Sequence, residues 1–162
     1  MIARELVDRL TARGLTVATA ESLTGGLVSA AIIDVPGASR VMRGGIVAYD
    51  TRAKHTLVGV DERLLSERGA VDPRVAEQLA EGVRTAFTLD GVAADMGIST
   101  TGVAGPDPQD GQPVGTVFVG VAMAGESRVS QFLFEGDRAS IRAATVQAAL
   151  SLALEMLGAP GE

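Results

Sequence analysis

The sequence predicts an α/β domain in three layers, with a mixed sheet of about four to six strands flanked by helices. Segments with strand periodicity alternate with segments of helical periodicity over most of the chain, the pattern of α/β proteins. The length of 162 residues is typical of one domain, so we expect residues 1–162 to form a single unit. With 46% hydrophobic and 21% charged residues, the chain has enough apolar surface for a packed core.

Four elements are predicted before residue 50. Apolar residues at helical spacing predict a helix over 2–14, which a glycine ends. Alternation then predicts a strand over 15–20. A glycine turn leads into an apolar helix over 27–33, and the small and apolar residues over 43–49 predict a second strand.

Three helices are predicted next. Thr51 is expected to be the N-cap of a helix over 51–57, and a short helix follows over 61–68. Asp72 and Pro73 start a longer helix, because proline suits the first helical turn and the apolar residues after it fall on one face.

The last third of the chain is predicted as strands and one helix. A buried strand over 93–100 precedes an antiparallel pair over 115–123 and 128–134, which turns at a glycine. Asp137 is expected to cap a final helix over 137–157. Residues 159–162 are expected to fray.

The composition excludes several kinds of chemistry. There is no cysteine, which excludes disulfides, a thiolate nucleophile and a zinc site built on sulfur. His55 is the only histidine, so a site with two histidine ligands is excluded as well. A net charge of −6 has the wrong sign for a nucleic-acid-binding protein. Charged residues interrupt the first ten positions, and no apolar run reaches ~20 residues, so we expect a cytoplasmic protein without a membrane segment.

A serine stands at a predicted strand-to-helix junction. The run AESLTGG over 20–26 places Ser22 and Thr24 just ahead of the helix over 27–33. Such a junction exposes a hydroxyl at the end of a sheet and points free helix amides at it, which suits a nucleophile with an oxyanion or phosphate beside it. In the alternative interpretation, Ser22 or Thr24 only caps the helix.

Lys54 is the only lysine of the chain and lies close to Tyr49, the only tyrosine. Arginine stays protonated in proteins, whereas a desolvated lysine can act as a neutral base. The candidate bases for Ser22 are therefore Lys54, Tyr49, His55 or a carboxylate, and serine–lysine pairs are one known form of hydroxyl activation. The alternative for Lys54 is a solvated surface lysine. On a helix, His55 points about 100° away from Lys54, so we expect a surface histidine.

A loop rich in glycine and proline is predicted over 101–113. Its glycines and hydroxyls can form an anion-binding nest of backbone amides at the carboxyl end of the sheet, although a long turn is the alternative. Arg138 lies in the first turn of the last helix, where the helix dipole disfavours a cation. We therefore expect Arg138 either to pair with an acidic neighbour or to face a ligand phosphate. Asp107 and Asp110 lack further acidic neighbours, so no metal site is expected.

Five runs of the sequence resemble the CinA C-terminal domain family in the same order. They are AESLTGG at 20–26, GGIVAYDTRAK at 44–54, GISTTGVAGPD at 97–107, PVGTVFVGVA at 113–122 and FEGDR at 134–138. The resemblance implies a nicotinamide-nucleotide amidohydrolase, which hydrolyses nicotinamide mononucleotide (NMN) to nicotinic acid mononucleotide and ammonia without a metal or other cofactor. Many relatives have a cysteine where this chain has Leu23, which indicates that the cysteine is a packing residue. Larger members carry a further N-terminal domain, so we expect this chain to be the stand-alone form.

The resemblance also implies roles for individual residues. It assigns Ser22 as the nucleophile and matches Tyr49 and Lys54 to the family's tyrosine and lysine. We expect neutral Lys54, helped by Tyr49, to take the Ser22 proton and pass it to ammonia, after which water releases the acyl-enzyme. Amides near residues 24–26 or 101–102 would hold the oxyanion. The expected substrate-binding residues are Thr24, Gly25, Gly26, Thr101, Gly102, Gly105 and Arg138.

Two expectations concern partners. A non-catalytic nucleotide-binding or regulatory partner-binding module is the alternative to an enzyme, and a Lys54 amine out of reach of Ser22 would favour it. The alanine-rich stretch over 143–154 is apolar on more than one face, which predicts a homodimer in which a second subunit covers it. The alternative is that the same chain covers this helix.

Overall fold

A computed structural model describes residues 1–158 and contains a five-stranded sheet between two layers of helices. The strands are β1 (Val17–Glu21), β2 (Met42–Val47), β3 (Met96–Gly102), β4 (Thr116–Met123) and β5 (Glu126–Leu133). The helices are α1 (Ile2–Arg13), α2 (Leu27–Ile33), α3 (Thr51–Val58), α4 (Glu62–Arg68), α5 (Pro73–Ala86) and α6 (Arg138–Met156), with a 3₁₀ turn, η1 (Ala38–Arg40). The predicted α/β class is confirmed.

The sheet combines a parallel half with an antiparallel half. Its strand order is β2-β1-β3-β4-β5, in which β2, β1 and β3 are parallel while β4 and β5 are antiparallel to their neighbours. The last residue of β1, Glu21, pairs with Val47 of β2 and with Thr100 of β3. The segments that follow β1, β2 and β3 therefore leave the same end of the sheet side by side.

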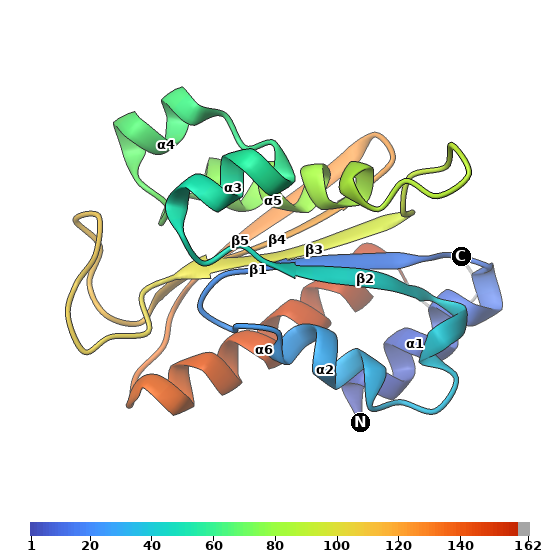
Figure 1. Cartoon of the computed structure of the whole chain (residues 1–162). Coiled ribbons are helices and arrows are strands. Elements are labelled where there is room, and N and C mark those ends of the chain that lie inside the picture. The colour runs from blue at the N-terminus through green and yellow to red at the C-terminus, as the bar shows by residue number, and fades with distance from the viewer. Residues whose placement is uncertain (159–162) are drawn as a thin grey trace.

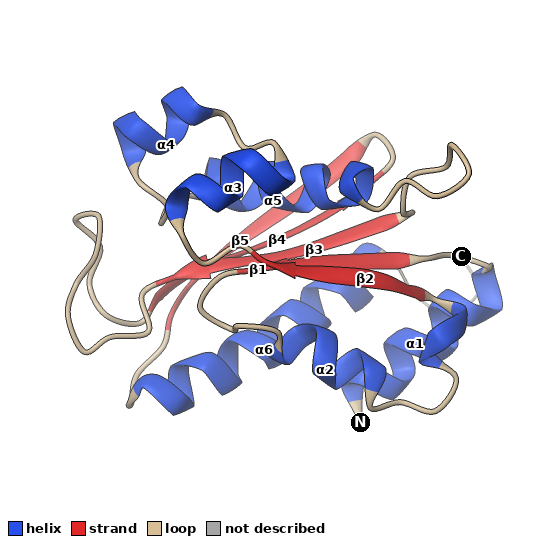
Figure 2. Cartoon of the chain, viewed as in Figure 1, coloured by secondary structure: helices blue, strands red, loops and turns tan. Residues whose placement is uncertain are grey.

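The two helical layers use different elements (Figure 1). Helices α3, α4 and α5 cover one face, and α1, α2 and α6 cover the other, as the colouring by secondary structure in Figure 2 also makes plain. The side chains of β1 alternate between these layers. Ala18 and Ala20 belong to the apolar cluster that includes residues of α3 and α5, whereas Val17 belongs to the cluster with α1, α2 and α6.

Glycine lets α5 lie directly on the sheet. A Cβ atom built on Gly97 of β3 would stand 1.9 Å from the carbonyl oxygen of Ala80, and one on Gly120 of β4 would stand 2.5 Å from that of Ala76. No larger residue fits at these two positions unless α5 moves away. The close approach brings the first turn of α5 and the segment before it to the end of β3.

The structure corrects three local predictions. The N-cap of α3 is Asp50, whose carboxylate accepts the Arg52 amide, and not Thr51, which is the first helical residue. Residues 101–102 extend β3 instead of starting the loop, because Gly102 still pairs with Val117 of β4. The loop over 103–115 also contains a tight turn at Asp110 and Gly111, both with positive φ, which fits an Asp-Gly hairpin turn.

Helix α6 is covered within the chain. It packs against the sheet and against α1 and α2, and between Ile141 and Met156 only Ala143, Gln147 and Glu155 are exposed. The homodimer therefore stays a prediction that the burial of α6 does not itself require. The expected fraying of 159–162 lies outside the described residues. Within residues 1–158, no helix is both long and apolar enough to span a bilayer.

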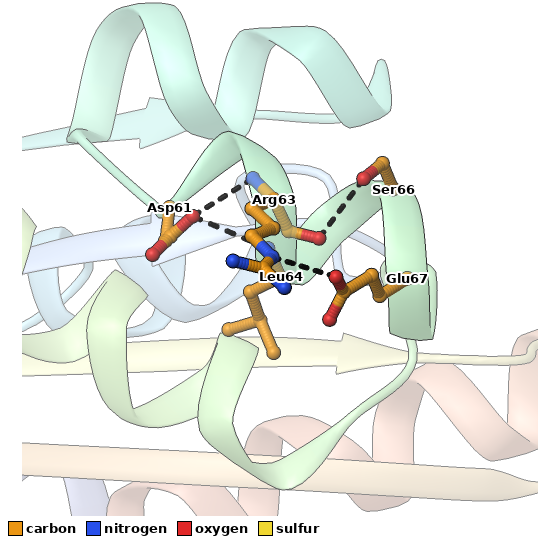
Figure 3. Close-up of polar contacts among 5 residues, drawn as sticks. All are labelled: Asp61, Arg63, Leu64, Ser66 and Glu67. Atoms are coloured by element: carbon orange, nitrogen blue, oxygen red, sulfur yellow. Dashed lines mark hydrogen bonds and ion pairs between the residues drawn. The ribbon is translucent and has the colours of Figure 1, made fainter.

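Helix α4 is held by contacts within its own turns (Figure 3). The Asp61 carboxylate caps the helix by accepting the amides of Arg63, at 2.8 Å, and of Leu64, at 3.2 Å. One turn further on, the Arg63 guanidinium pairs with Glu67 at 2.7 Å, with both side chains largely exposed. The cap satisfies orphan backbone donors, whereas the ion pair is screened by water.

We therefore expect Asp61→Ala to lower the free energy of unfolding by about 1 kcal/mol, because it leaves two helix amides without their acceptor. The matched variant Glu67→Ala removes only the exposed ion pair and is expected to change it by less than about 0.5 kcal/mol. Urea denaturation of both variants measures the difference. Equal losses would mean that the cap contributes no more than the ion pair.

Candidate active site

Ser22 and Lys54 meet at the carboxyl end of the parallel strands. Along β1, Thr19 and Glu21 bond with Ser29 of α2, and Ser22 continues the alternation toward the opposite face, where α3 lies. The Lys54 Nζ donates to Ser22 Oγ at 3.1 Å and to the carbonyl oxygen of Ala48 at 2.6 Å. The pair predicted from the sequence is thus in direct contact, and Lys54 is not a solvated surface residue.

The Lys54 amine is held in an environment that disfavours its charge. Its side chain is 1% exposed and Ser22 is 8% exposed. Burial lowers the pKa of Lys54 to about 8, and the more distant carboxylates of Asp50 and Asp110 oppose this shift only in part. Since the Arg52 side chain and amide lower the pKa of Asp50 to about 2, that carboxylate stays ionised at neutral pH. Lys54 therefore has an appreciable neutral fraction near neutrality.

A cavity of about 200 Å³ opens over this pair. Its lining includes Ser22, Lys54, Tyr49, Thr101, Gly102, Gly105 and Arg138, which brings seven of the sequence-predicted site residues to one place. Tyr49 is 60% exposed, and its hydroxyl accepts from the Arg138 guanidinium at 2.9 Å. Arg138 also donates to the carbonyl of Gly105 at 2.7 Å. Arg138 is thus bound to neutral oxygens and keeps its positive charge at the rim of the cavity.

The loop over 103–115 forms one wall of the cavity and is fastened at its turn. The Asp110 carboxylate accepts the amide of Ala70 at 2.8 Å and of Val71 at 3.4 Å, in the segment between α4 and α5. Thr101 reaches the same segment, since its hydroxyl donates to the Ala70 carbonyl at 2.7 Å. Ala70 and Val71 also line the cavity, so these contacts join two walls of the site.

The turn between β1 and α2 differs from the expected nucleophile turn. The Glu21 carboxylate accepts the amides of Val28 and Ser29 at 2.8 and 2.9 Å, so the first turn of α2 does not offer these amides to a ligand. Neither Ser22 nor Thr24 caps α2, because its N-cap is Gly26 without a side-chain bond. The expectation of free helix amides and the capping interpretation are therefore both wrong.

Some predicted site residues are not brought to the cavity. Thr24 is fully buried and its hydroxyl contacts that of Thr100 at 2.8 Å. Gly25 and Gly26 are also absent from the lining. Tyr49 lines the cavity but bonds to Arg138 and not to the serine–lysine pair. His55 is exposed, with Nδ1 at 2.7 Å from the Val60 carbonyl, so it does not serve as a base for Ser22.

Two residues near the site have no counterpart among the sequence predictions. Glu21 is a fully buried acid in a fully buried strand, and Arg142 is a cation within the mostly apolar helix α6. Charged residues at such positions are a usable sequence signal. Their partners are mostly backbone atoms, however, and no sequence pattern identifies those. Among residues 1–158, no three His, Asp or Glu side chains gather as a metal site.

The chain is similar to several known proteins. It is 46% identical to a CinA-like protein of Frankia casuarinae over 91% of this chain and 33% of that protein. It is 44% identical to a putative competence-damage inducible protein of Geobacillus kaustophilus over 94% of this chain and 36% of that one. The chain thus spans about a third of the length of these curated relatives.

Solved structures share the fold over nearly the whole chain. A competence/damage inducible protein of Agrobacterium tumefaciens is 34% identical with a TM-score of 0.89, and the match covers 98% of this chain and 94% of that one. A CinA superfamily protein of Escherichia coli is 31% identical with a TM-score of 0.89, over 96% and 88% of the two chains. The model of the CinA C-terminal domain family matches residues 1–157. The chain therefore belongs to the CinA C-terminal domain family.

Proposed function

We propose that this chain is a nicotinamide-nucleotide amidohydrolase, which converts NMN and water to nicotinic acid mononucleotide and ammonia. The observation that carries the proposal is the buried contact between Lys54 Nζ and Ser22 Oγ, at 3.1 Å, on the wall of a cavity. Acyl transfer through a serine needs a base within hydrogen-bond reach of the hydroxyl, and a neutral lysine meets that need. The choice of NMN rests on the family resemblance.

The proposed reaction begins when neutral Lys54 accepts the Ser22 proton. A neutral amine keeps two N–H groups, one of which can remain on the Ala48 carbonyl, and presents its lone pair to the serine hydroxyl. Ser22 Oγ then attacks the carboxamide carbon, the C–N bond breaks, and Lys54 returns the proton to the leaving ammonia. Water next attacks the acyl carbon, Lys54 takes its proton and passes it to Ser22 Oγ as the ester bond breaks, and the acid product leaves.

The rim of the cavity supplies groups for the rest of the nucleotide. The guanidinium of Arg138 suits a phosphate, because it is always charged and forms paired hydrogen bonds with phosphate oxygens. Tyr49 holds Arg138 at the rim and presents an exposed ring beside it. In this arrangement Tyr49 acts on the substrate side of the site and not on the serine–lysine pair.

The alternative is a module that binds a nucleotide or a partner without catalysis. Such a module has no need for a buried amine against a serine, because burial of a lysine costs free energy that a binding role does not recover. The module would be favoured if Ser22 Oγ and Lys54 Nζ were too far apart for a single water molecule to bridge them. The direct contact at 3.1 Å supports the enzyme instead.

The first test is ammonia release from NMN by the purified protein, with and without a chelator. We expect release in both conditions, since the described residues offer no cluster of metal ligands. A coupled glutamate dehydrogenase assay measures the ammonia. Loss of activity with chelator that a divalent ion restores would contradict the metal-free mechanism.

The second test is Ser22→Ala. Removing the attacking oxygen is expected to lower kcat by at least about 10³-fold, as for other nucleophiles. The fold should persist, because the Ser22 side chain lies at a turn and not in an apolar cluster. Ser66→Ala, on exposed α4, is the matched control and should keep wild-type kcat. Retention of more than a few per cent of activity in Ser22→Ala would remove Ser22 as the nucleophile.

The third test measures the protonation of Lys54 directly. Because Lys54 is the only lysine, protein labelled with ¹³C-lysine gives one side-chain signal, and we expect it to titrate near pH 8 instead of near its ordinary value. The base must be neutral, so kcat should rise with pH through the same midpoint; roughly a tenth of the amine is neutral at pH 7. A titration midpoint above 10 would contradict the proposed base.

Substitution of Lys54 separates proton transfer from charge. Lys54→Arg should be nearly as inactive as Lys54→Ala, because arginine keeps the charge but does not accept a proton. Steady-state kinetics of both variants, with far-ultraviolet circular dichroism to check folding, make the comparison. Recovery of most activity in Lys54→Arg, with the remaining loss in KM, would assign Lys54 to substrate binding.

A further inference from the structure

A side chain of α6 holds the turn that follows Ser22, from the face of the sheet that α6 covers. The Arg142 guanidinium donates through Nε to the carbonyl of Leu23 at 2.8 Å and through one terminal nitrogen to the carbonyl of Thr24 at 3.2 Å. Arg142 forms no ion pair with the acidic residues of the described chain, so these two carbonyls are its polar partners. A charged side chain thus forms its hydrogen bonds with two successive peptide groups next to the serine.

These contacts fix the direction of the peptide N–H groups. The only cis peptide bond among residues 1–158 is at Gly105-Pro106, so the peptides after Leu23 and Thr24 are trans. In a trans peptide the N–H points opposite to the C=O. The N–H groups of Thr24 and Gly25 therefore point away from the Arg142 guanidinium, which reaches the turn from α6. Helix α3, which carries Lys54, lies on the opposite face of the sheet from α6 (Figure 1). The Gly25 N–H indeed donates to the Ser22 carbonyl at 3.0 Å.

Two amides at this turn have no acceptor. The N–H groups of Gly25, Leu27, Val28 and Ser29 all have partners, but those of Leu23 and Thr24 have none among residues 1–158. Leu23 and Thr24 are both buried, and Leu23 lines the cavity beside Ser22. Buried backbone N–H groups almost always have a partner, so a pair without one next to a nucleophile calls for a ligand.

We propose that Arg142 is a positioning residue: by holding the carbonyls of Leu23 and Thr24, it fixes the turn whose two N–H groups without acceptors, that of Leu23 on the cavity wall and that of Thr24 next to it, receive the negative oxygen formed when Ser22 attacks a carbonyl carbon. This inference rests on the proposed acyl transfer and assigns the oxyanion to the turn after β1. It leaves the loop over 103–115 and Arg138 to the nucleotide phosphate. Arg142 itself is not expected to touch the substrate, because it is not among the residues that line the cavity.

The test compares Arg142→Ala and Arg142→Lys with Arg84→Ala. Arg84 is the matched control, because it also donates from a helix to a backbone carbonyl, that of Ala94 at 2.9 Å, but at the opposite end of β3. Two rates are measured for each protein: ammonia release from NMN, and labelling of Ser22 by a fluorophosphonate, in which Oγ displaces fluoride from phosphorus and the P=O oxygen takes the oxyanion position. Melting temperatures report on folding.

For Arg142→Ala we expect kcat and the labelling rate to fall together by roughly 10²-fold, the usual effect of losing oxyanion donors, with KM within about threefold of wild type. Arg142→Lys keeps the charge but loses the contact with two carbonyls at once. It should fold, and its kcat and labelling rate should lie between those of wild type and Arg142→Ala. Millimolar guanidinium should restore part of the labelling rate in Arg142→Ala. Arg84→Ala should keep both rates even if its melting temperature falls as much.

The outcomes separate this inference from the proposed function. If wild type releases no ammonia from NMN but labelling still slows in the Arg142 variants alone, the substrate is wrong and the positioning role stands. If Arg142→Ala is labelled as fast as Arg84→Ala, or if only KM rises, the positioning role is overturned. Wild-type protein that neither reacts nor is labelled would overturn both.

Discussion

The site depends on keeping the amine of one lysine out of water without a carboxylate partner. Lys54 is 1% exposed and forms no ion pair with any acidic residue of the described chain; its amine bonds only to a hydroxyl and a carbonyl. Burial without a counter-ion favours the neutral amine, and a salt bridge would do the opposite. Helix α3 supplies this lysine, and the segment after β2 supplies the Ala48 carbonyl that its amine contacts.

The segments around the site are fixed mainly by contacts between charged side chains and backbone atoms. Glu21 holds the start of α2, Asp110 holds the loop over 103–115 against residues 70–71, and Arg142 holds two carbonyls of the serine turn. Each contact is charge-assisted, which makes it stronger than a bond between neutral groups. Their hydrogen bonds go to peptide groups and, for Glu21, to the Ser29 hydroxyl as well, and none of the three forms an ion pair with Lys54 or Arg138.

The serine and the lysine that meet at the cavity could be named as candidates from the sequence, and their supports could not. Rarity made Lys54 a candidate, and the position of Ser22 between a strand and a glycine turn made it another. The family resemblance, and not the pattern alone, favoured both over a surface lysine and a helix cap. The Asp-Gly pair at 110–111 is a hairpin signal that the prediction of a loop over 101–113 did not use, and a second such pair stands at 90–91, where nothing was predicted. The contact of Arg142 spans 119 positions and ends on a carbonyl that every residue type possesses, so no pattern in the sequence identifies it.

The antiparallel half of the sheet places an exposed turn at the end of the molecule opposite the cavity. Strand β3 runs toward the cavity, so β4 runs away from it, and the exposed turn at Ala124 and Gly125 lies at the far end of the molecule. Nothing stands within 4 Å of the place where a Gly125 side chain would begin. A tether or fluorescent tag attached at this turn would fix the protein to a surface with its cavity facing the solution.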